Sequence, residues 1–164
     1  MLKPLETLLE RDNRFALLVV PEAGGFRRMT LADHYGMVAA VNIGRSAPDE
    51  VQTMFSRAQH ALIYAWFDYE LSAVAEFQVL ATVELALRER LQPAPTMMLK
   101  ALVKLAVAQG LVPPKVGDFP AEIWFSGIRN RWAHGSANFG TPSMTLTVIE
   151  VCADLIRRLY PPQP

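Results

Sequence analysis

The sequence has too few cysteines to cross-link the chain through disulfides or to bind a metal through several thiols. One cysteine, Cys152, stands among 164 residues, which excludes an intramolecular disulfide and any cysteine-rich zinc site. An excess of one charge is also missing, because 16 Lys and Arg balance 16 Asp and Glu. This neutrality argues against a non-specific nucleic-acid coat protein, although it leaves room for a local basic site.

Long apolar runs are absent as well. The longest, such as residues 61–67, fall far short of a membrane span, and the start Met1–Pro4 lacks the apolar stretch of a signal peptide. We therefore expect a cytoplasmic protein without a membrane-spanning segment. A length of 164 residues, 51% of them hydrophobic, suits one domain with a sizeable core.

Residues 1–46 differ in pattern from the rest and are interpreted as an N-terminal elaboration. Residues 2–11 can form a short amphipathic helix. The apolar run 15–20 ends at Pro21, and residues 26–29 return as a candidate second strand, which together predict a β-hairpin. Thr30, with an acid three residues later, predicts a capped helix that runs to about residue 43.

Residues 47–160 show helical patterns throughout. Pro48 suits the first position of a helix, Pro93 ends a second one, and Thr141 and Pro142 begin the last. Two further helices are expected over about 96–109 and 119–135. The sequence therefore predicts an all-α, up-and-down bundle of four to five helices over 47–160, with 161–164 as a tail.

Two of these helices carry apolar stripes that predict their buried faces. The second helix repeats apolar residues in steps of three and four, and the last helix does the same. The two stripes are Ala73, Phe77, Leu80, Glu84, Leu87 and Leu91, and Met144, Val148, Val151, Leu155 and Leu159.

The densest functional chemistry lies at residues 128–135, Ile-Arg-Asn-Arg-Trp-Ala-His-Gly, at the end of an expected helix. Asn130 and His134 lie one turn apart on one face, whereas Arg129 is about 140° round from His134. Arg129 and His134 could therefore converge only across the helix end or against another surface, such as a second copy at a two-fold axis. Cations before a glycine also suit an ordinary helix end, where the macrodipole favours each by ~0.3–1 kcal/mol.

The stretch from Arg129 to Gly135 resembles the signature of the HEPN family (higher eukaryote and prokaryote nucleotide-binding), an Arg and a His separated by four to six residues. Residues 64–71, 84–88 and 155–160 resemble helices of the same family, so the likeness covers about 47–160. It implies an HEPN-like bundle that dimerises through the motif helix. In catalytic members the motif cleaves RNA and needs neither a metal nor a cofactor.

Carried over to this chain, the resemblance gives His134 the role of general acid or base and Arg129 that of stabilising the transition state. Asn130 would orient His134 or bind a phosphate oxygen, and the product would be a 2′,3′-cyclic phosphate. Arg131 and Trp132 are the candidate RNA contacts, the arginine at phosphate and the indole on a base, although Trp132 could instead belong to the core or to a dimer interface.

The biological setting implied by the resemblance is stress or phage defence, with an antitoxin or another operon-encoded partner. Some family members in toxin–antitoxin pairs have a tyrosine two residues after the histidine, which the partner modifies. This chain has Ser136 there, which puts that form of regulation in doubt.

Several alternatives stay open. Glu84, an acid on an apolar stripe, is expected either to pair with Arg129 or Arg131 or to be a solvated residue at the stripe's edge. His34 and His60 lack ligand-spaced partners, so no metal site is predicted. The rival to a ribonuclease is a non-catalytic dimeric module that binds a nucleotide or a partner protein, and a purely structural bundle is the third interpretation.

Overall fold

The computed structural model describes residues 3–133 and 140–162, with 132 and 133 as backbone only. The described part is mostly helical, with two small antiparallel hairpins. Along the chain the elements are β1 (Val19–Glu22), β2 (Gly25–Arg28), α1 (Leu31–Ala40), α2 (Asp49–Tyr64), α3 (Leu71–Leu91), α4 (Leu99–Ala108), β3 (Lys115–Val116), β4 (Phe119–Pro120), α5 (Ala121–Ala133) and α6 (Pro142–Leu159). None of the helices in the described ranges is long and apolar enough to cross a bilayer.

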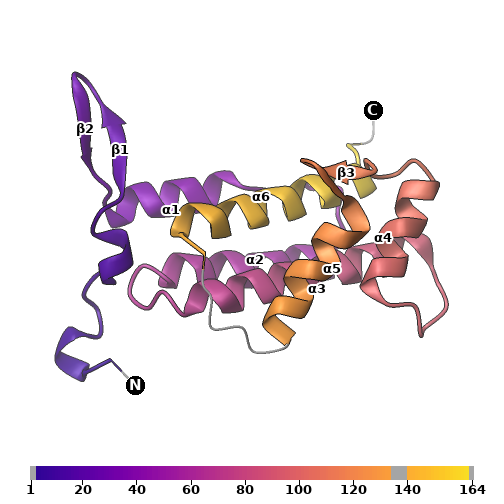
Figure 1. The fold of residues 1–164 in the computed structure, drawn as a ribbon, viewed down its shortest axis with the longest axis horizontal. Coiled ribbons are helices and arrows are strands. Elements are labelled where there is room, and N and C mark those ends of the chain that lie inside the picture. The colour runs from indigo at the N-terminus through magenta and orange to yellow at the C-terminus, as the bar shows by residue number, and fades with distance from the viewer. Residues whose placement is uncertain (1–2, 134–139, 163–164) are drawn as a thin grey trace.

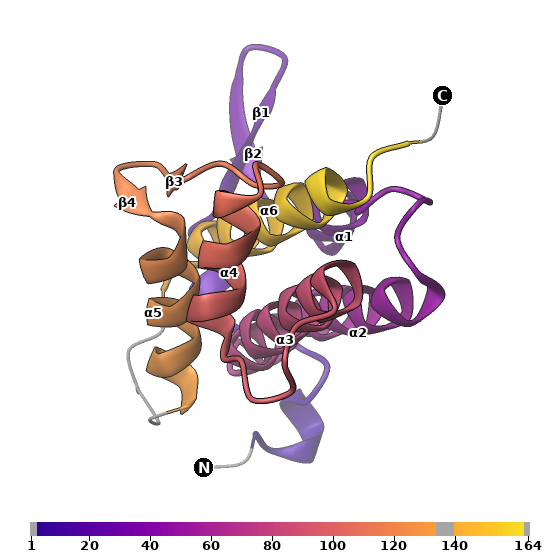
Figure 2. The same ribbon diagram turned by 90° about the vertical axis from the view of Figure 1, so that its right-hand side faces the viewer.

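The helices are stacked in two layers with a crossing pair at one end. Helices α1 and α6 lie over α2 and α3, while α4 and α5 run steeply across them (Figures 1 and 2). Helix α3 packs against α2, α4, α5 and α6, which makes it the centre of the fold. The first hairpin projects from the opposite end of the molecule (Figure 1). The main core lies among these helices, and its largest fully buried members include Leu62, Leu80, Leu87, Phe125 and Ile156.

The predicted helix starts are confirmed at both ends of the chain. The Thr30 hydroxyl accepts a hydrogen bond from the Asp33 backbone N–H, and the Asp33 carboxylate accepts one from the Thr30 N–H. At the start of α6 the Thr141 side chain accepts from the N–H of Met144. The predicted end of the first helix at residue 43 is wrong, because α1 ends at Ala40 and the extended segment after it buries Val41 and Ile43 in the main core.

The N-terminal segment departs from expectation in two places. The predicted helix over 2–11 is wrong: within its described part the structure has one 3₁₀ turn, Leu5–Thr7, and Leu5 stays exposed, so no apolar face is buried to stabilise a longer helix. The β-hairpin is confirmed, but Pro21 lies inside β1 opposite Phe26 and does not end it. A two-stranded ribbon has open edges, where the missing N–H of a proline is tolerated.

A second, smaller core joins the N-terminal segment to the helices. Phe15, which the hairpin prediction placed in a strand, belongs to a 3₁₀ turn and is fully buried. It packs with Met29 and with Trp66 and Tyr69 from the connection between α2 and α3. The Phe15 ring lies 5.1 Å from that of Trp66 and 5.8 Å from that of Tyr69. The hairpin is therefore attached to the bundle through its base.

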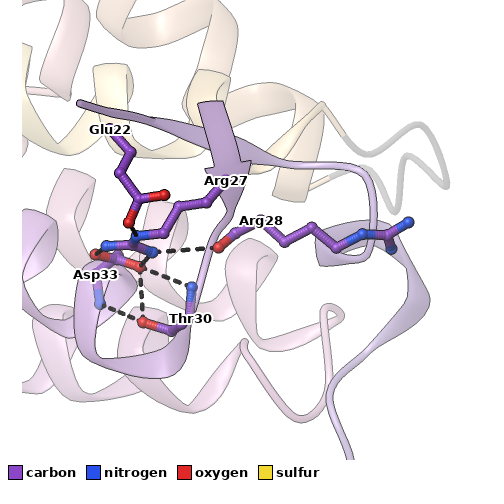
Figure 3. A network of polar contacts seen from close by, with 5 residues as sticks. All are labelled: Glu22, Arg27, Arg28, Thr30 and Asp33. Atoms are coloured by element: carbon purple, nitrogen blue, oxygen red, sulfur yellow. Dashed lines mark hydrogen bonds and ion pairs between the residues drawn. The ribbon is translucent and has the colours of Figure 1, made fainter. Parts of the chain in front are cut away.

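Polar contacts fix the same hairpin to the start of α1 (Figure 3). The Arg27 guanidinium donates to both carboxylate oxygens of Asp33, at 2.5 and 2.7 Å, and also faces Glu22 at 3.4 Å. Asp33 accepts from the Thr30 hydroxyl as well, at 2.6 Å. The hydrogen bond from Arg27, followed by those from Thr30, lowers the pKa of Asp33 well below its ordinary value.

The two predicted apolar stripes are confirmed only in part, because Leu80, Leu87, Leu155 and Leu159 are buried and other members are not. Phe77 on α3 is 47% exposed and Met144 on α6 is 55% exposed, although each was expected inside. Several helices cover α3, so its burial extends round more of the cylinder than one stripe. The buried residues are Ser72, Ala75, Glu76, Val79, Leu80, Thr82, Val83, Ala86 and Leu87 on α3, and Thr145, Ile149, Cys152, Ala153, Leu155, Ile156 and Leu159 on α6.

The short hairpin β3–β4 has no counterpart among the expected elements. Its strands pair Lys115 with Pro120 and Val116 with Phe119. Strands of two residues are too short to show the alternation that identifies a strand in a sequence. The hairpin leads directly into α5, since its second strand ends at Pro120 and the helix begins at Ala121.

The Arg27–Asp33 contact predicts an acid-sensitive step in stability. Because the pKa of folded Asp33 lies below the unfolded value of about 3.9, this carboxylate contributes stability above about pH 4 and loses it as the pH falls. Asp33→Asn should lower the urea midpoint at pH 7 and flatten its fall between about pH 6 and pH 2 (~two units either side of the unfolded pKa). Glu22→Gln, which leaves Asp33 and Arg27 paired, should keep the acid sensitivity, and equal pH profiles for wild type and Asp33→Asn would contradict this assignment.

Candidate functional site

The motif occupies the last turn of α5, as far as the structure describes it. Arg129 is partly buried there, while Asn130 and Arg131 are exposed. His134 lies outside the described residues, and Trp132 is described as helical backbone only. The structure therefore brings Arg129, Asn130 and Arg131 together at one helix end and leaves the predicted placement of His134 untested.

These three polar side chains have no partners in the described part of the chain. Arg129, Asn130 and Arg131 form no hydrogen bond or ion pair with any described residue. Other arginines behave differently, since Arg27, Arg88 and Arg158 each contact a carboxylate. Two cations at one helix end with no ion-pair partner among the described residues are suited to bind an anion such as a phosphate.

A groove runs beside the motif between α5 and α6. Both helices pack on α3, and the space between them encloses about 440 Å³. Arg131 lines it from the last turn of α5, and Glu76 lines it from α3. The other lining residues are Phe119, Ile123, Trp124, Gly127, Ile128, Gly140, Met144, Thr147 and Val148. Among its described lining residues, the groove thus combines largely apolar walls with one cation and one carboxylate.

Glu76 is the buried acid of this site and is 4% exposed. Its Oε1 accepts a hydrogen bond of 2.8 Å from the Thr145 hydroxyl, which ties α3 to the first turn of α6. Burial, and then the negative charge of Glu76, raise the pKa of the Cys152 thiol well above its ordinary value. The surroundings of the buried Glu76 therefore include the Cys152 thiol on α6.

Tyr69 makes a second contact near the start of α6. Its hydroxyl donates to the carbonyl of Gly140 at 2.5 Å, directly before the Thr141 cap of α6. Burial raises the pKa of the Tyr69 phenol, so the hydroxyl keeps its proton and remains a donor at neutral pH. The chain segment that re-enters α6 is thus anchored to the start of α3.

Glu84 does not have the partner predicted for it. Its side chain is 26% exposed, and its carboxylate pairs with Arg88 at 2.8 Å, one turn further along α3, with no contact to Arg129 or Arg131. A glutamate four residues before an arginine is the favoured order for an intrahelical ion pair. The acid that lies in the groove with Arg131 is Glu76, two turns earlier on α3.

Sequence reasoning missed Glu76, although a signal for it exists. Apolar residues stand at Ala75, Val79, Leu80 and Val83, at spacings of one, three, four and seven from Glu76. That pattern places the acid in the middle of a buried face. The predicted stripe contains Phe77 and Glu84, so it indicated Glu84, and not Glu76, as the acid on the buried face of α3.

The remaining candidates have structural roles in the described residues. His34 is buried, its Nε2 donates to the Leu62 carbonyl at 2.8 Å, and burial lowers the pKa of its imidazole. His60 is exposed on α2. No group of three His, Cys, Asp or Glu in the described part of the chain could hold a metal ion.

The Glu76–Thr145 contact predicts a large cost for a small change. Thr145→Val keeps the shape of the side chain but removes the donor to a buried carboxylate, which should lower the free energy of unfolding by about 1.5–3 kcal/mol. Thr147→Val on the same helix is the matched control, because among the described residues the exposed Thr147 hydroxyl bonds only the Ser143 carbonyl, and it should change stability by less than ~0.5 kcal/mol. Equal unfolding midpoints in urea for the two variants would contradict this role.

Gly127 gives a second stability prediction. It lies inside α5 on the groove, and a Cβ built on it meets no atom within 4 Å. Gly127→Ala should therefore raise the free energy of unfolding by roughly 0.5–1 kcal/mol through helix propensity. Gly36→Ala in α1 is equally open and should gain a similar amount. A loss of stability in Gly127→Ala alone, measured by thermal unfolding, would mean that the fold needs the space.

Comparisons of the chain with protein-family models, with curated proteins and with solved structures find no match. The case for a function rests on the residue chemistry and geometry described above. Its central elements are the cations at the end of α5, which have no partner among the described residues, and the groove that Arg131 lines together with Glu76.

Proposed function

We propose that this chain is a metal-independent endoribonuclease of HEPN type, built on an HEPN-like helical bundle and active as a homodimer paired through α5. The observation that carries the proposal is the set of polar side chains at the end of α5. Arg129, Asn130 and Arg131 have no partner among the described residues, and they precede His134 in the sequence. An arginine without an acidic partner is available to a phosphodiester.

The proposed reaction needs no group that the chain lacks. One His134 takes the proton of the ribose 2′-hydroxyl, and the 2′-oxygen forms a bond to phosphorus. The bond from phosphorus to the 5′-oxygen breaks, and a second His134 gives that oxygen a proton. The products are a 2′,3′-cyclic phosphate and a 5′-hydroxyl. An imidazole titrates near neutral pH, which suits both proton transfers, while Arg129 stabilises the charge that develops on the phosphoryl oxygens.

The outward face of α5 supports pairing with a second copy. Ile123, Gly127, Asn130 and Arg131 are all exposed along it, at helical spacings of four, three and one. A two-fold axis beside this face would bring two motifs into one cleft, with the apolar Ile123 and the small Gly127 at the contact. A stress or phage-defence role with an operon-encoded partner belongs to the same proposal.

The second candidate is a non-catalytic dimeric module that binds a nucleotide or a partner protein. That function favours motif side chains that are capped or ion-paired within the fold. The exposure of Asn130 and Arg131, and the lack of a described partner for Arg129, weigh toward the enzyme.

The decisive experiment measures RNA cleavage in EDTA by the wild type and by Arg129→Ala and His134→Ala. Wild type should cut and leave 2′,3′-cyclic phosphate ends, and each variant should lose about 10²–10⁴-fold in rate, the usual contribution of acid–base and electrostatic catalysis. Arg158→Ala is the matched control, because Arg158 pairs with Asp154 on α6 and should cut as wild type does.

Two outcomes would contradict the ribonuclease proposal. A folded, dimeric wild type that cuts none of a diverse set of structured and unstructured RNAs would transfer the assignment to the binding module. Cleavage that survives in His134→Ala would point to a contaminating nuclease and would remove the support for the proposed mechanism.

A further inference from the structure

Another pocket, of about 390 Å³, lies where the base of the first hairpin meets α1, α2 and the start of α6. These elements come together at the end of the molecule from which the hairpin projects (Figure 1). Apart from His34 and Ser143, its described lining residues are apolar, and none of them is an acid, a lysine or an arginine. No described residue of α5 lines it, so the pocket is separate from the motif and from the face that pairs in the proposed dimer.

The buried polar group of this pocket is the imidazole of His34, a residue that is 6% exposed. Burial lowers the pKa of this imidazole below its ordinary value, so the ring is neutral at pH 7. Its Nε2 carries the proton, because the partner of Nε2, the Leu62 carbonyl at 2.8 Å, can only accept a hydrogen bond. The other ring nitrogen, Nδ1, therefore has a lone pair and is an acceptor.

The Nδ1 acceptor makes no hydrogen bond to a described residue. In the described part of the chain, Ser72 Oγ is the one side-chain N or O atom of an unexposed residue that is both shut off from solvent and without a partner. Nδ1 is therefore not shut off, and it is open to the pocket that His34 lines. The rings of Phe15, at 5.0 Å, and Trp66, at 5.8 Å, pack on the imidazole and hold it in this orientation.

We infer that this pocket binds a small, uncharged aromatic molecule with one N–H or O–H group, which donates to Nδ1 of His34. A single acceptor inside apolar walls matches one donor on an apolar body. A charged ligand would find no acid, lysine or arginine among the described lining residues to pair with its charge, and burying an unpaired charge is costly.

An aromatic body suits these walls better than an aliphatic chain. The Phe15 ring and the thioethers of Met29 and Met37 line the pocket, and both kinds of group make favourable contacts with aromatic rings. The volume of about 390 Å³ is within the usual range for small-molecule sites, roughly 300–1,000 Å³. A ligand here contacts the hairpin base, α1, α2 and α6 at once, so its binding should stabilise the folded chain.

The probes are indole and indene, titrated into the wild type by calorimetry at pH 7. The two molecules have nearly the same size and shape, but indene lacks the N–H donor. Indole should bind at least as tightly as indene, because Nδ1 accepts from its N–H. In a pocket without an acceptor the buried N–H would be unsatisfied, and indole would bind about tenfold more weakly than indene. That outcome, or no binding of either probe, would overturn the inference.

Two variants place the ligand in the pocket. His34→Phe keeps a ring but removes the acceptor, so it should weaken indole relative to indene by about tenfold. Val20→Trp fills the pocket from β1 and should abolish the binding of both probes, which keeps the test decisive if His34→Phe fails to fold. Val74→Trp, the same change at an exposed position of α3 outside the pocket, is the matched control and should bind as wild type does. An unchanged affinity ratio in a folded His34→Phe, or unchanged binding in a folded Val20→Trp, would overturn the inference.

Ligand binding and RNA cleavage are separable in the same protein. Arg129→Ala, which should lose cleavage, should bind indole as wild type does, because no described residue of α5 lines the pocket. Indole binding in a chain that cuts no RNA supports the pocket and counts against the ribonuclease. Cleavage without indole binding overturns the pocket and leaves the ribonuclease standing.

Discussion

The fold depends on the packing of α3, which has neighbours on most of its circumference. Helices α2, α4, α5 and α6 all contact it, and its buried residues, Ala75, Val79, Val83 and Leu87 among them, extend beyond a single stripe. A helix with this much apolar surface is stable only when other helices cover it. The positions of α5 and α6 follow from that requirement, since each must bury a different part of α3, and the space left between them becomes the groove.

The polar contacts of α3 then determine where the chain re-enters the bundle after the motif. A buried carboxylate is costly unless it is hydrogen-bonded, and Glu76 obtains a donor from Thr145 in the first turn of α6. Tyr69 donates to Gly140, one residue before the α6 cap. The end of α5 packs through Ile128 into the same core. Both flanks of the motif are therefore attached to α3 or to the connection that directly precedes it.

Features encoded by a few neighbouring residues could be predicted from the sequence, whereas features set by tertiary packing could not. The caps at Thr30 and Thr141 depend on one side chain and a backbone N–H within three residues, and both are where the sequence predicts them. Buried faces depend on which helices lie alongside. The predicted buried stripe on α3 is therefore wrong at Phe77, which is exposed, and it includes Glu84, which pairs with Arg88. Glu76 became recognisable as the acid of the site only once α5 and α6 were seen on either side of it.

The neutral charge of the chain bears on how such a site could select RNA. With 16 basic and 16 acidic residues, the protein has no net charge to attract nucleic acid from a distance. The two arginines at the end of α5, which have no partner among the described residues, act over about a Debye length, ~8 Å at physiological salt. Attraction of that range holds a phosphate already at the helix end but does not distinguish one RNA from another. On the ribonuclease proposal, discrimination between RNAs would therefore have to come from contacts at the base edges.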